Sequence, residues 1–282
     1  MVYLILAVLA SSAVAIIMRL GEKHVKNSFA MFMANYIVCS LIAFLLVEDK
    51  ALFAPREGLS FALLLGLGSG CLYLTSLALM KLNISRSGVM LTSVFMKLGV
   101  LVPAMIAIVF FRESPTALQI IGFVLAVAAI LLIYLEPKGE GKAASGKASA
   151  FLLILLFVGG LTESMANIFD KLGSPALKDH FLLFNFFTAF LLSLGVTLIR
   201  RQKVSWKDIA FGAAIGVPNY FATRFLLLSL GSIPAVVVYP IYNVGAIVLI
   251  SLAGLLLFKE KLSARKLMGM VIIITALVLL NL

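Results

Sequence analysis

FFRESPTALQIIG occupies residues Phe110 to Gly122, and LFKEKLSARKLMG repeats its pattern 147 positions later, from Leu257 to Gly269. A second pair of segments supports this match, because MRLG at residues 18–21 is answered by DKLG at residues 170–173. The first pair lies late in each half of the chain, and the second pair lies early in it. One sequence pattern therefore occurs twice.

The composition is that of an integral membrane protein. Of the 282 residues, 63% are hydrophobic and only 12% are charged, and the mean hydropathy is +1.16. A water-soluble domain needs a largely polar surface, so this composition excludes one. The opening LAVLASSAVA, at residues 6–15, could end a signal peptide, but no basic segment precedes it. We interpret it as the first transmembrane helix.

Ten apolar segments of about 18 to 24 residues fill nearly the whole chain, and each is long enough to cross a hydrocarbon core of about 30 Å. They are residues 2–20, 28–47, 60–80, 87–110, 116–135, 150–170, 181–199, 208–230, 234–257 and 263–281. Each half holds five segments, and this odd number turns the second copy upside down in the membrane. We predict an all-α integral membrane protein of ten transmembrane helices, with inverted five-helix repeats at 1–135 and 150–282 that form one transport unit. Residues 136–149, rich in Gly, Lys and Ser, are predicted to be a flexible linker.

The distribution of basic residues predicts the orientation. Loops after the first, third, fifth, seventh and ninth segments carry sixteen Lys and Arg residues, whereas the other loops carry five. Loops rich in Lys and Arg stay in the cytoplasm, so we expect a multi-pass protein of the plasma (inner) membrane with both termini on the non-cytoplasmic side. The net charge of +11 then reflects topology, and no nucleic-acid partner is expected.

Several residues are predicted to serve the scaffold. Glu113 and its repeat counterpart Glu260 are expected to be helix-terminal charges, because the helix dipole favours anions at N-termini. Gly66 and Gly70 are four residues apart, a spacing that lets two helices approach closely. The two cysteines show no metal-ligand spacing, and no metal or cofactor is expected.

Four ionisable residues lie inside apolar segments: Lys97 in the fourth, Glu163 and Asp170 in the sixth, and Arg224 in the eighth. A charge at the bilayer centre costs at least about 2.5 to 3.5 kcal/mol, so such residues are candidates for a functional site. Their repeat counterparts are uncharged. We therefore expect the symmetric residues to build the fold and these asymmetric ones to build specificity.

Uncharged polar residues accompany these charges. On the sixth segment, Glu163, Asn167 and Asp170 fall on one helix face, which suits the wall of a water-filled cavity. The predicted substrate-binding residues are Thr92, Ser93, Lys97, Glu163, Asn167, Asn219, Tyr220, Arg224, Tyr239, Tyr242 and Asn243. Glu163 and Asp170 are predicted to act as gate or coupling residues, with Glu163 as a proton-coupling carboxylate.

Two interpretations of these groups stay open. In the first, they line a central pocket whose cations hold an anionic or zwitterionic solute, while tyrosines stack on its apolar part. In the second, Lys97 and Arg224 only neutralise Glu163 and Asp170 as internal salt bridges. An enzyme or a channel is a lower alternative, because the sequence has no H-E-x-x-H or G-x-S-x-G motif and no repeated ring of pore charges.

The fourth and ninth segments both end in F-x-E, with a glycine nine residues on, at Gly122 and Gly269. With ten short segments in two halves, this pattern resembles EamA-type permeases of the drug/metabolite transporter (DMT) superfamily over essentially the whole chain. The resemblance implies a secondary active transporter that exports or exchanges small metabolites by alternating access. A drug or organic cation held by Glu163 is the alternative solute. The expected partners are the solute, the lipid bilayer and a coupling proton, and we expect a monomer or homodimer.

Overall fold

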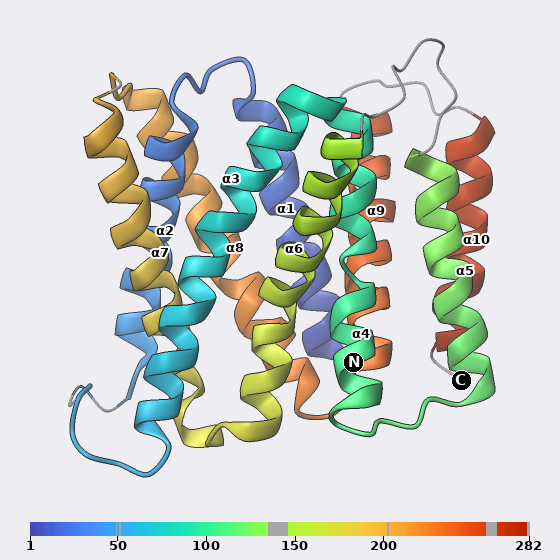
Figure 1. The fold of residues 1–282 in the computed structure, drawn as a ribbon, viewed down its shortest axis with the longest axis horizontal. Helices are drawn as coiled ribbons and strands as arrows, with labels where there is room; N and C mark the ends of the chain where they lie inside the picture. Colours follow the sequence, from blue (N-terminus) through green and yellow to red (C-terminus); the bar gives the residue numbers. More distant parts are fainter. Residues whose placement is uncertain (49, 51, 135–145, 202, 258–263, 281–282) are drawn as a thin grey trace. The chain divides into compact units, whose positions relative to one another are not determined.

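The computed structural model describes residues 1–282 except 49, 51, 135–145, 202, 258–263 and 281–282 (Figure 1). Every regular element in this described part is helical. The elements are α1 (Val2–Gly21), α2 (Ser28–Leu46), α3 (Leu59–Leu98), α4 (Leu101–Val109), α5 (Ala117–Tyr134), α6 (Gly146–Leu172), the 3₁₀ turn η1 (Pro175–Leu177), α7 (Lys178–Arg200), α8 (Trp206–Leu230), α9 (Ala235–Leu257) and α10 (Ala264–Leu280).

Seven helices within the described ranges are long and apolar enough to cross a membrane. They are α1, α2, the first part of α3 (Leu59–Met80), α6, α7, α8 and α9. Shorter apolar helices cover Phe95–Val109, Ala117–Leu132 and Leu267–Leu280. The prediction of an all-α, multi-pass membrane protein is therefore confirmed.

The predicted boundary between the third and fourth segments is wrong. A loop was expected between residues 80 and 87, but α3 continues through this region and ends only at Leu98. The intervening KLNISR is polar but contains neither proline nor glycine, so nothing interrupts its helical hydrogen bonds. The break comes instead at Gly99, inside the predicted segment 87–110. Pro103 has no N–H to donate to the carbonyl of Gly99, and the N–H of Val102 donates to it instead at 3.0 Å.

The region between the predicted repeats is described only in part. Residues 135–145 of it lie outside the described residues. The four residues 146–149, predicted as the end of the linker, already belong to α6. The sixth helix thus begins four residues earlier than the sequence indicated.

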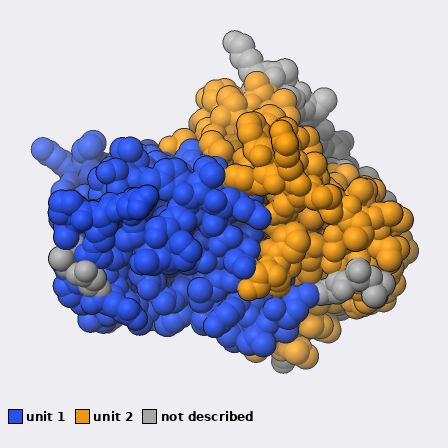
Figure 2. All heavy atoms as spheres, turned by 90° about the horizontal axis from the view of Figure 1, so that it is seen from below, with its two compact units in different colours: residues 1–74, 165–231 blue, residues 75–164, 232–282 orange. Residues whose placement is uncertain are grey.

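The described residues form two compact units (Figure 2). Unit 1 contains residues 1–74 and 165–231, and unit 2 contains residues 75–164 and 232–282. Each unit therefore takes helices from both predicted repeats. The sequence halves 1–135 and 150–282 are not themselves the compact units.

In unit 1, α2 packs against α7 and α8, and α1 packs against α8 (Figure 1). Glycines let α3 approach α7 closely in this unit. A Cβ atom added at Gly66 would lie 2.7 Å from Cβ of Phe184, and one at Gly70 would lie 2.6 Å from Cβ of Thr188. Real Cβ atoms essentially never come so close, so the predicted role of Gly66 and Gly70 in helix contact is confirmed.

A second glycine pair joins α8 to α2 in the same way. A Cβ atom at Gly212 would lie 2.2 Å from the carbonyl oxygen of Met31, and one at Gly216 would lie 2.8 Å from that of Asn35. These glycines are also four residues apart. Two contacts in unit 1 therefore depend on the same spacing of small residues.

A buried carboxylate links the start of α8 to the segment between α1 and α2. The side chain of Asp208, with 0% of its residue surface exposed, accepts hydrogen bonds from the backbone N–H groups of Lys26 at 2.8 Å and Asn27 at 3.3 Å. Its second oxygen accepts from the N–H of Ser205 at 2.8 Å, which completes a capping box. Three backbone donors and the N-terminal helix dipole thus stabilise this charge.

In unit 2, α5 packs against α10, and α4 packs against α9. The core between α5 and α10 consists of small and branched side chains, namely Ala126, Ala129, Ile130, Ile273 and Ala276. A Cβ atom at Gly122, the glycine of the duplicated motif, would lie 3.0 Å from the carbonyl oxygen of Ala276. This glycine therefore serves the close contact of α5 with α10.

Glu113, the acidic residue of the same motif, lies at a helix terminus. Its Oε2 atom accepts a hydrogen bond from the N–H of Val236 at 3.2 Å, in the first turn of α9. The predicted role as a helix-terminal charge is confirmed for Glu113. Its counterpart Glu260 lies outside the described residues.

We predict that Gly70→Ala destabilises the protein by about 1 to 3 kcal/mol, because the new methyl group overpacks the contact with α7. Gly68→Ala is the matched control, since a Cβ atom there meets nothing within 4 Å. The control should be unchanged or more stable by up to about 1 kcal/mol, because alanine is the better helix former. Thermal unfolding in detergent measures both, and equal melting temperatures would contradict the close contact.

We predict that Asp208→Ala lowers the free energy of unfolding by about 3 kcal/mol, because three backbone donors lose a charged acceptor. Glu22→Ala removes an exposed carboxylate from the segment that Asp208 holds, and it serves as the control. The measurement is the apparent melting temperature in detergent. An Asp208 variant as stable as the control would refute the structural role.

Candidate functional site

The predicted site residues occur in both units. Unit 1 contains Asn167, Asp170, Asn219, Tyr220 and Arg224, and unit 2 contains Thr92, Lys97, Glu163, Tyr239, Tyr242 and Asn243. Ser93 belongs to α3, but its side chain lies outside the described part of the chain.

Glu163 is the centre of the group in unit 2. Its Oε2 atom accepts a hydrogen bond from Nδ2 of Asn243 at 3.2 Å, and its backbone carbonyl accepts one from the hydroxyl of Tyr239 at 2.8 Å. The same amide of Asn243 also donates to the carbonyl of Tyr239 at 3.2 Å, one turn earlier on α9. Two polar residues of α9 thus donate hydrogen bonds to Glu163 of α6.

Lys97 interacts electrostatically with Glu163. Because α3 ends at Leu98, Lys97 lies in the last turn of this helix, where the negative end of the helix dipole favours a cation. A cation from α3 and an amide from α9 therefore both act on a carboxylate from α6 within unit 2. We call Lys97, Glu163, Tyr239 and Asn243 the Glu163 cluster.

The other two members of this group lie on the same helices. Thr92 is buried on α3, and Tyr242 is half-buried on α9, one residue before Asn243. Pro240 lies inside α9 in the same turn and leaves a backbone carbonyl without its helical donor. This part of unit 2 therefore concentrates polar groups inside two apolar helices.

Arg224 forms an ion pair in unit 1. Its guanidinium nitrogens contact the two carboxylate oxygens of Asp179, with Nη2 at 3.4 Å from Oδ2, and Nη1 also donates to the hydroxyl of Tyr220 at 2.8 Å. The side chains of Arg224 and Asp179 are about a quarter exposed, at 24% and 27%. The arginine is thus held in a fork-shaped contact that an anion could also make.

Asp179 was missed by the sequence analysis. It lies in the first turn of α7, where the helix dipole favours an acidic residue. Because the predicted segment began at residue 181, Asp179 was assigned to a loop. An acidic residue just before an apolar run is the signal that could have identified it.

Asp170 pairs with Lys178, whose Nζ atom lies 3.1 Å from its Oδ1 atom. The side chains are 9% and 21% exposed, respectively. Arg224 pairs with Asp179, and a salt bridge between Arg224 and Asp170, which the sequence left open, is not seen among the described residues. Between Lys97 and Glu163 the interaction is electrostatic, and a direct salt bridge between them is not seen in the described part of the chain.

The two asparagines of unit 1 differ in their contacts. Asn219 donates a hydrogen bond to Oδ1 of Asn35 at 3.2 Å, and this oxygen also accepts from the thiol of Cys39 at 3.7 Å. Asn35 and Cys39 were missed because α2 carries no charged residue. Asn167 is fully buried, and neither atom of its amide has a hydrogen-bond partner in the described part of the chain. Such a group is costly unless something else satisfies it.

Comparisons with known proteins agree with this structure. Residues 1–135 match the EamA-like transporter family, and residues 194–273 match the small multidrug resistance protein family. An uncharacterized protein of Haemophilus influenzae is 25% identical over 286 aligned positions, which cover 97% of this chain and 95% of that protein.

A solved crystal structure has the same fold. It superposes with a TM-score of 0.77 over 99% of this chain and 94% of that one, at 12% sequence identity. So low an identity establishes the fold alone. The family matches and the apolar helices indicate a membrane transporter of the DMT superfamily. The first 135 residues of the chain are thus similar to the EamA-like transporter family.

Proposed function

We propose that this chain is a secondary active transporter with ten transmembrane helices in two inverted repeats, which moves a small polar metabolite by alternating access. Helices that occupy the same position in the two predicted repeats contact each other within a unit. These pairs are α2 with α7, α4 with α9 and α5 with α10. A two-fold axis between inverted repeats brings counterpart helices together in this way.

The glycine contacts also support the repeat. Gly66 and Gly70 bring α3 against α7, and Gly212 and Gly216 bring the counterpart helix α8 against α2. The backbone of Asn185 meets Gly70 as that of Asn35 meets Gly216. Since two unrelated halves have no reason to reproduce one contact, a duplicated origin explains the match.

The Glu163 cluster is the observation that carries the proposed solute. Lys97 and Glu163 offer opposite charges on two helices of unit 2, and Asn243 adds an amide. A solute with a carboxylate and an amine satisfies both charges, and an anion is attracted by Lys97. We therefore propose an anionic or zwitterionic metabolite, with Tyr239 and Tyr242 beside its apolar part.

Glu163 is the proposed coupling residue. A carboxylate inside a membrane-spanning helix can take up a proton from one side of the membrane and release it to the other. Asp170, paired with Lys178, is the proposed gate residue. In this scheme, Asp179 and an anionic solute compete for the guanidinium of Arg224. The amide of Asn167 supplies a donor and an acceptor that are unused in the described part of the chain.

The orientation follows the basic loops. We propose the inner membrane as the location, with both termini on the non-cytoplasmic side. The transporter works as a monomer or homodimer, with a proton as the coupling ion. A catalytic role is not proposed, because the family matches indicate transport.

The match to small multidrug resistance proteins favours a second candidate, an organic cation as the solute. Residues 194–273 include Tyr239 and Asn243 of the Glu163 cluster. In this alternative, Glu163 binds the cation directly and Lys97 takes no part in binding. The two candidates therefore differ in what Lys97 does.

We predict that Lys97→Ala lowers uptake of anionic or zwitterionic metabolites into proteoliposomes at least tenfold, because the solute loses its positive partner. Arg224→Ala should lower it less, since Arg224 already has Asp179 as a partner. Lys207→Ala removes an exposed lysine at the start of α8 and is the control. If Lys97→Ala and Arg224→Ala transport anions like the control, the cationic site is wrong.

We predict that Glu163→Gln abolishes transport driven by a proton gradient but retains solute exchange, because exchange needs no net proton movement. Internal pH and labelled solute, followed in the same vesicles, measure the two activities. A lipophilic organic cation supplies the second comparison. Flux of that cation that survives Lys97→Ala and is lost in Glu163→Gln would favour the second candidate over the first.

A further inference from the structure

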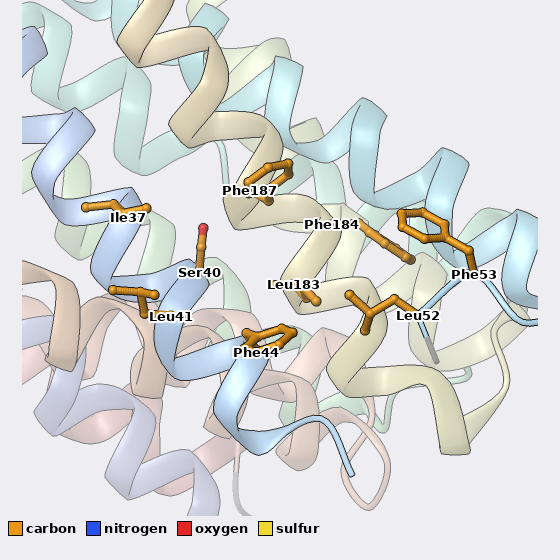
Figure 3. Close-up of a pocket in the computed structure, with 9 residues that line it drawn as sticks. All are labelled: Ile37, Ser40, Leu41, Phe44, Leu52, Phe53, Leu183, Phe184 and Phe187. Atoms are coloured by element: carbon orange, nitrogen blue, oxygen red, sulfur yellow. The ribbon is translucent and has the colours of Figure 1, made fainter. Parts of the chain in front are cut away.

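Unit 1 contains an apolar groove of about 320 Å³, which is within the range of small-molecule pockets (Figure 3). One wall is the outer face of α2 from Ile37 to Phe44, and the other is α7 from Leu183 to Phe187. Leu52 and Phe53, from the segment after α2, close one end. None of these residues belongs to the proposed solute site.

The groove offers no hydrogen bond to a ligand. Ser40 is its one polar lining residue, and the hydroxyl of Ser40 already donates to the carbonyl of Tyr36 at 2.7 Å. The remaining lining side chains are aliphatic or aromatic. A polar metabolite would lose its hydration here without compensation, so the ligand must be apolar.

The groove faces outward from two helices that are long enough to cross the membrane. Its floor is buried, since Ser40 and Phe184 are 4% and 6% exposed, whereas Leu41 and Phe187 on its rims are 54% and 46% exposed. Apolar side chains exposed on a transmembrane helix contact hydrocarbon. The groove is therefore open to the acyl chains of the surrounding lipids.

The length of the groove fits one leaflet. From Ile37 to the end of α2 at Leu46, the helix rises about 14 Å, which is close to half of a hydrocarbon core of about 30 Å. The groove thus runs from the membrane surface toward the bilayer centre. A single acyl chain of one leaflet has this extent and direction.

The positively charged side chain of Lys50 lies at the end of the groove near the membrane surface. The ammonium of Lys50 lies 4.8 Å from the ring centre of Phe44 and caps the end of α2, where it donates to the carbonyl oxygens of Val47 at 2.6 Å, Leu45 at 3.3 Å and Phe44. It is exposed and lies just beyond the end of α2. A lysine in this position attracts the phosphate of a lipid headgroup.

We propose that the groove binds one acyl chain of a phospholipid from the leaflet at the C-terminal end of α2, with the headgroup phosphate beside Lys50. The lipid covers the groove side of Phe184 and Phe187, whose rings otherwise contact Phe53 and Phe190. It also supports the segment that carries Leu52 and Phe53. The proposal depends on the membrane location of α2 and α7 and not on the identity of the solute.

Tryptophan fluorescence tests the proposal on the full chain. The single tryptophan, Trp206, is changed to phenylalanine, and a reporter is introduced by Phe187→Trp in the groove or Leu198→Trp elsewhere on the exposed face of α7. Phosphatidylglycerol with brominated chains, which quench tryptophan on contact, is titrated into detergent micelles. The groove reporter should be quenched saturably at about one lipid per chain, and the control reporter weakly and without saturation.

Two further variants fill the groove from opposite walls, Ser40→Leu from α2 and Leu183→Phe from α7. Each should abolish saturable quenching while the protein keeps its melting temperature and monodisperse elution. Saturable quenching that persists in both folded variants, or equal quenching of the two reporters, would overturn the proposal.

Lys50→Gln tests the headgroup separately. It should weaken binding of brominated phosphatidylglycerol several-fold and leave binding of a brominated fatty alcohol, which has no phosphate, unchanged. Equal affinity of Lys50→Gln and the parent chain for the phospholipid would refute the place assigned to the phosphate.

Discussion

A charge inside a bilayer needs a partner, and this constraint governs the polar residues of the chain. Removing a charged group from water costs several kcal/mol unless an opposite charge or hydrogen bonds compensate for it. Arg224 has Asp179 and Tyr220, and Asp170 has Lys178. These contacts explain how the apolar helices of unit 1 tolerate four charged side chains.

The Glu163 cluster differs from these ion pairs in composition. Its carboxylate has one amide donor on its side-chain oxygens, from Asn243, and a lysine that acts on it electrostatically. A solute that brings its own charges into the cluster replaces one set of interactions with another. This exchange of partners is what the proposed transport site requires.

The sequence predicted the all-α membrane fold well, because long apolar segments and their duplicated ends are local features. The role of Gly66 and Gly70 was also predictable, since it depends on spacing along one helix. The continuous helix α3 was not predicted. The basic residues at positions 81 and 86 suggested a loop, although the segment contains no residue that breaks a helix.

The partners of the charged residues were harder to predict. Asp179 lies 45 positions from Arg224, and Asn35 lies 184 positions from Asn219, so no local pattern connects them. Sequence identified which residues are unusual in a membrane, but only the fold determines which of them meet. The two-unit arrangement, in which each unit draws on both repeats, is likewise a tertiary property.

The central claim is that the Glu163 cluster binds a charged metabolite. A thermal-shift screen of the wild-type protein, Lys97→Ala and Glu163→Gln against anionic, zwitterionic and cationic metabolites tests it most directly. A ligand at one hundred times its dissociation constant stabilises the folded state by about 2.7 kcal/mol. An anionic or zwitterionic metabolite should raise the melting temperature of the wild-type protein and of Glu163→Gln, which retains solute exchange, but not that of Lys97→Ala. A metabolite that stabilises all three proteins equally would contradict it.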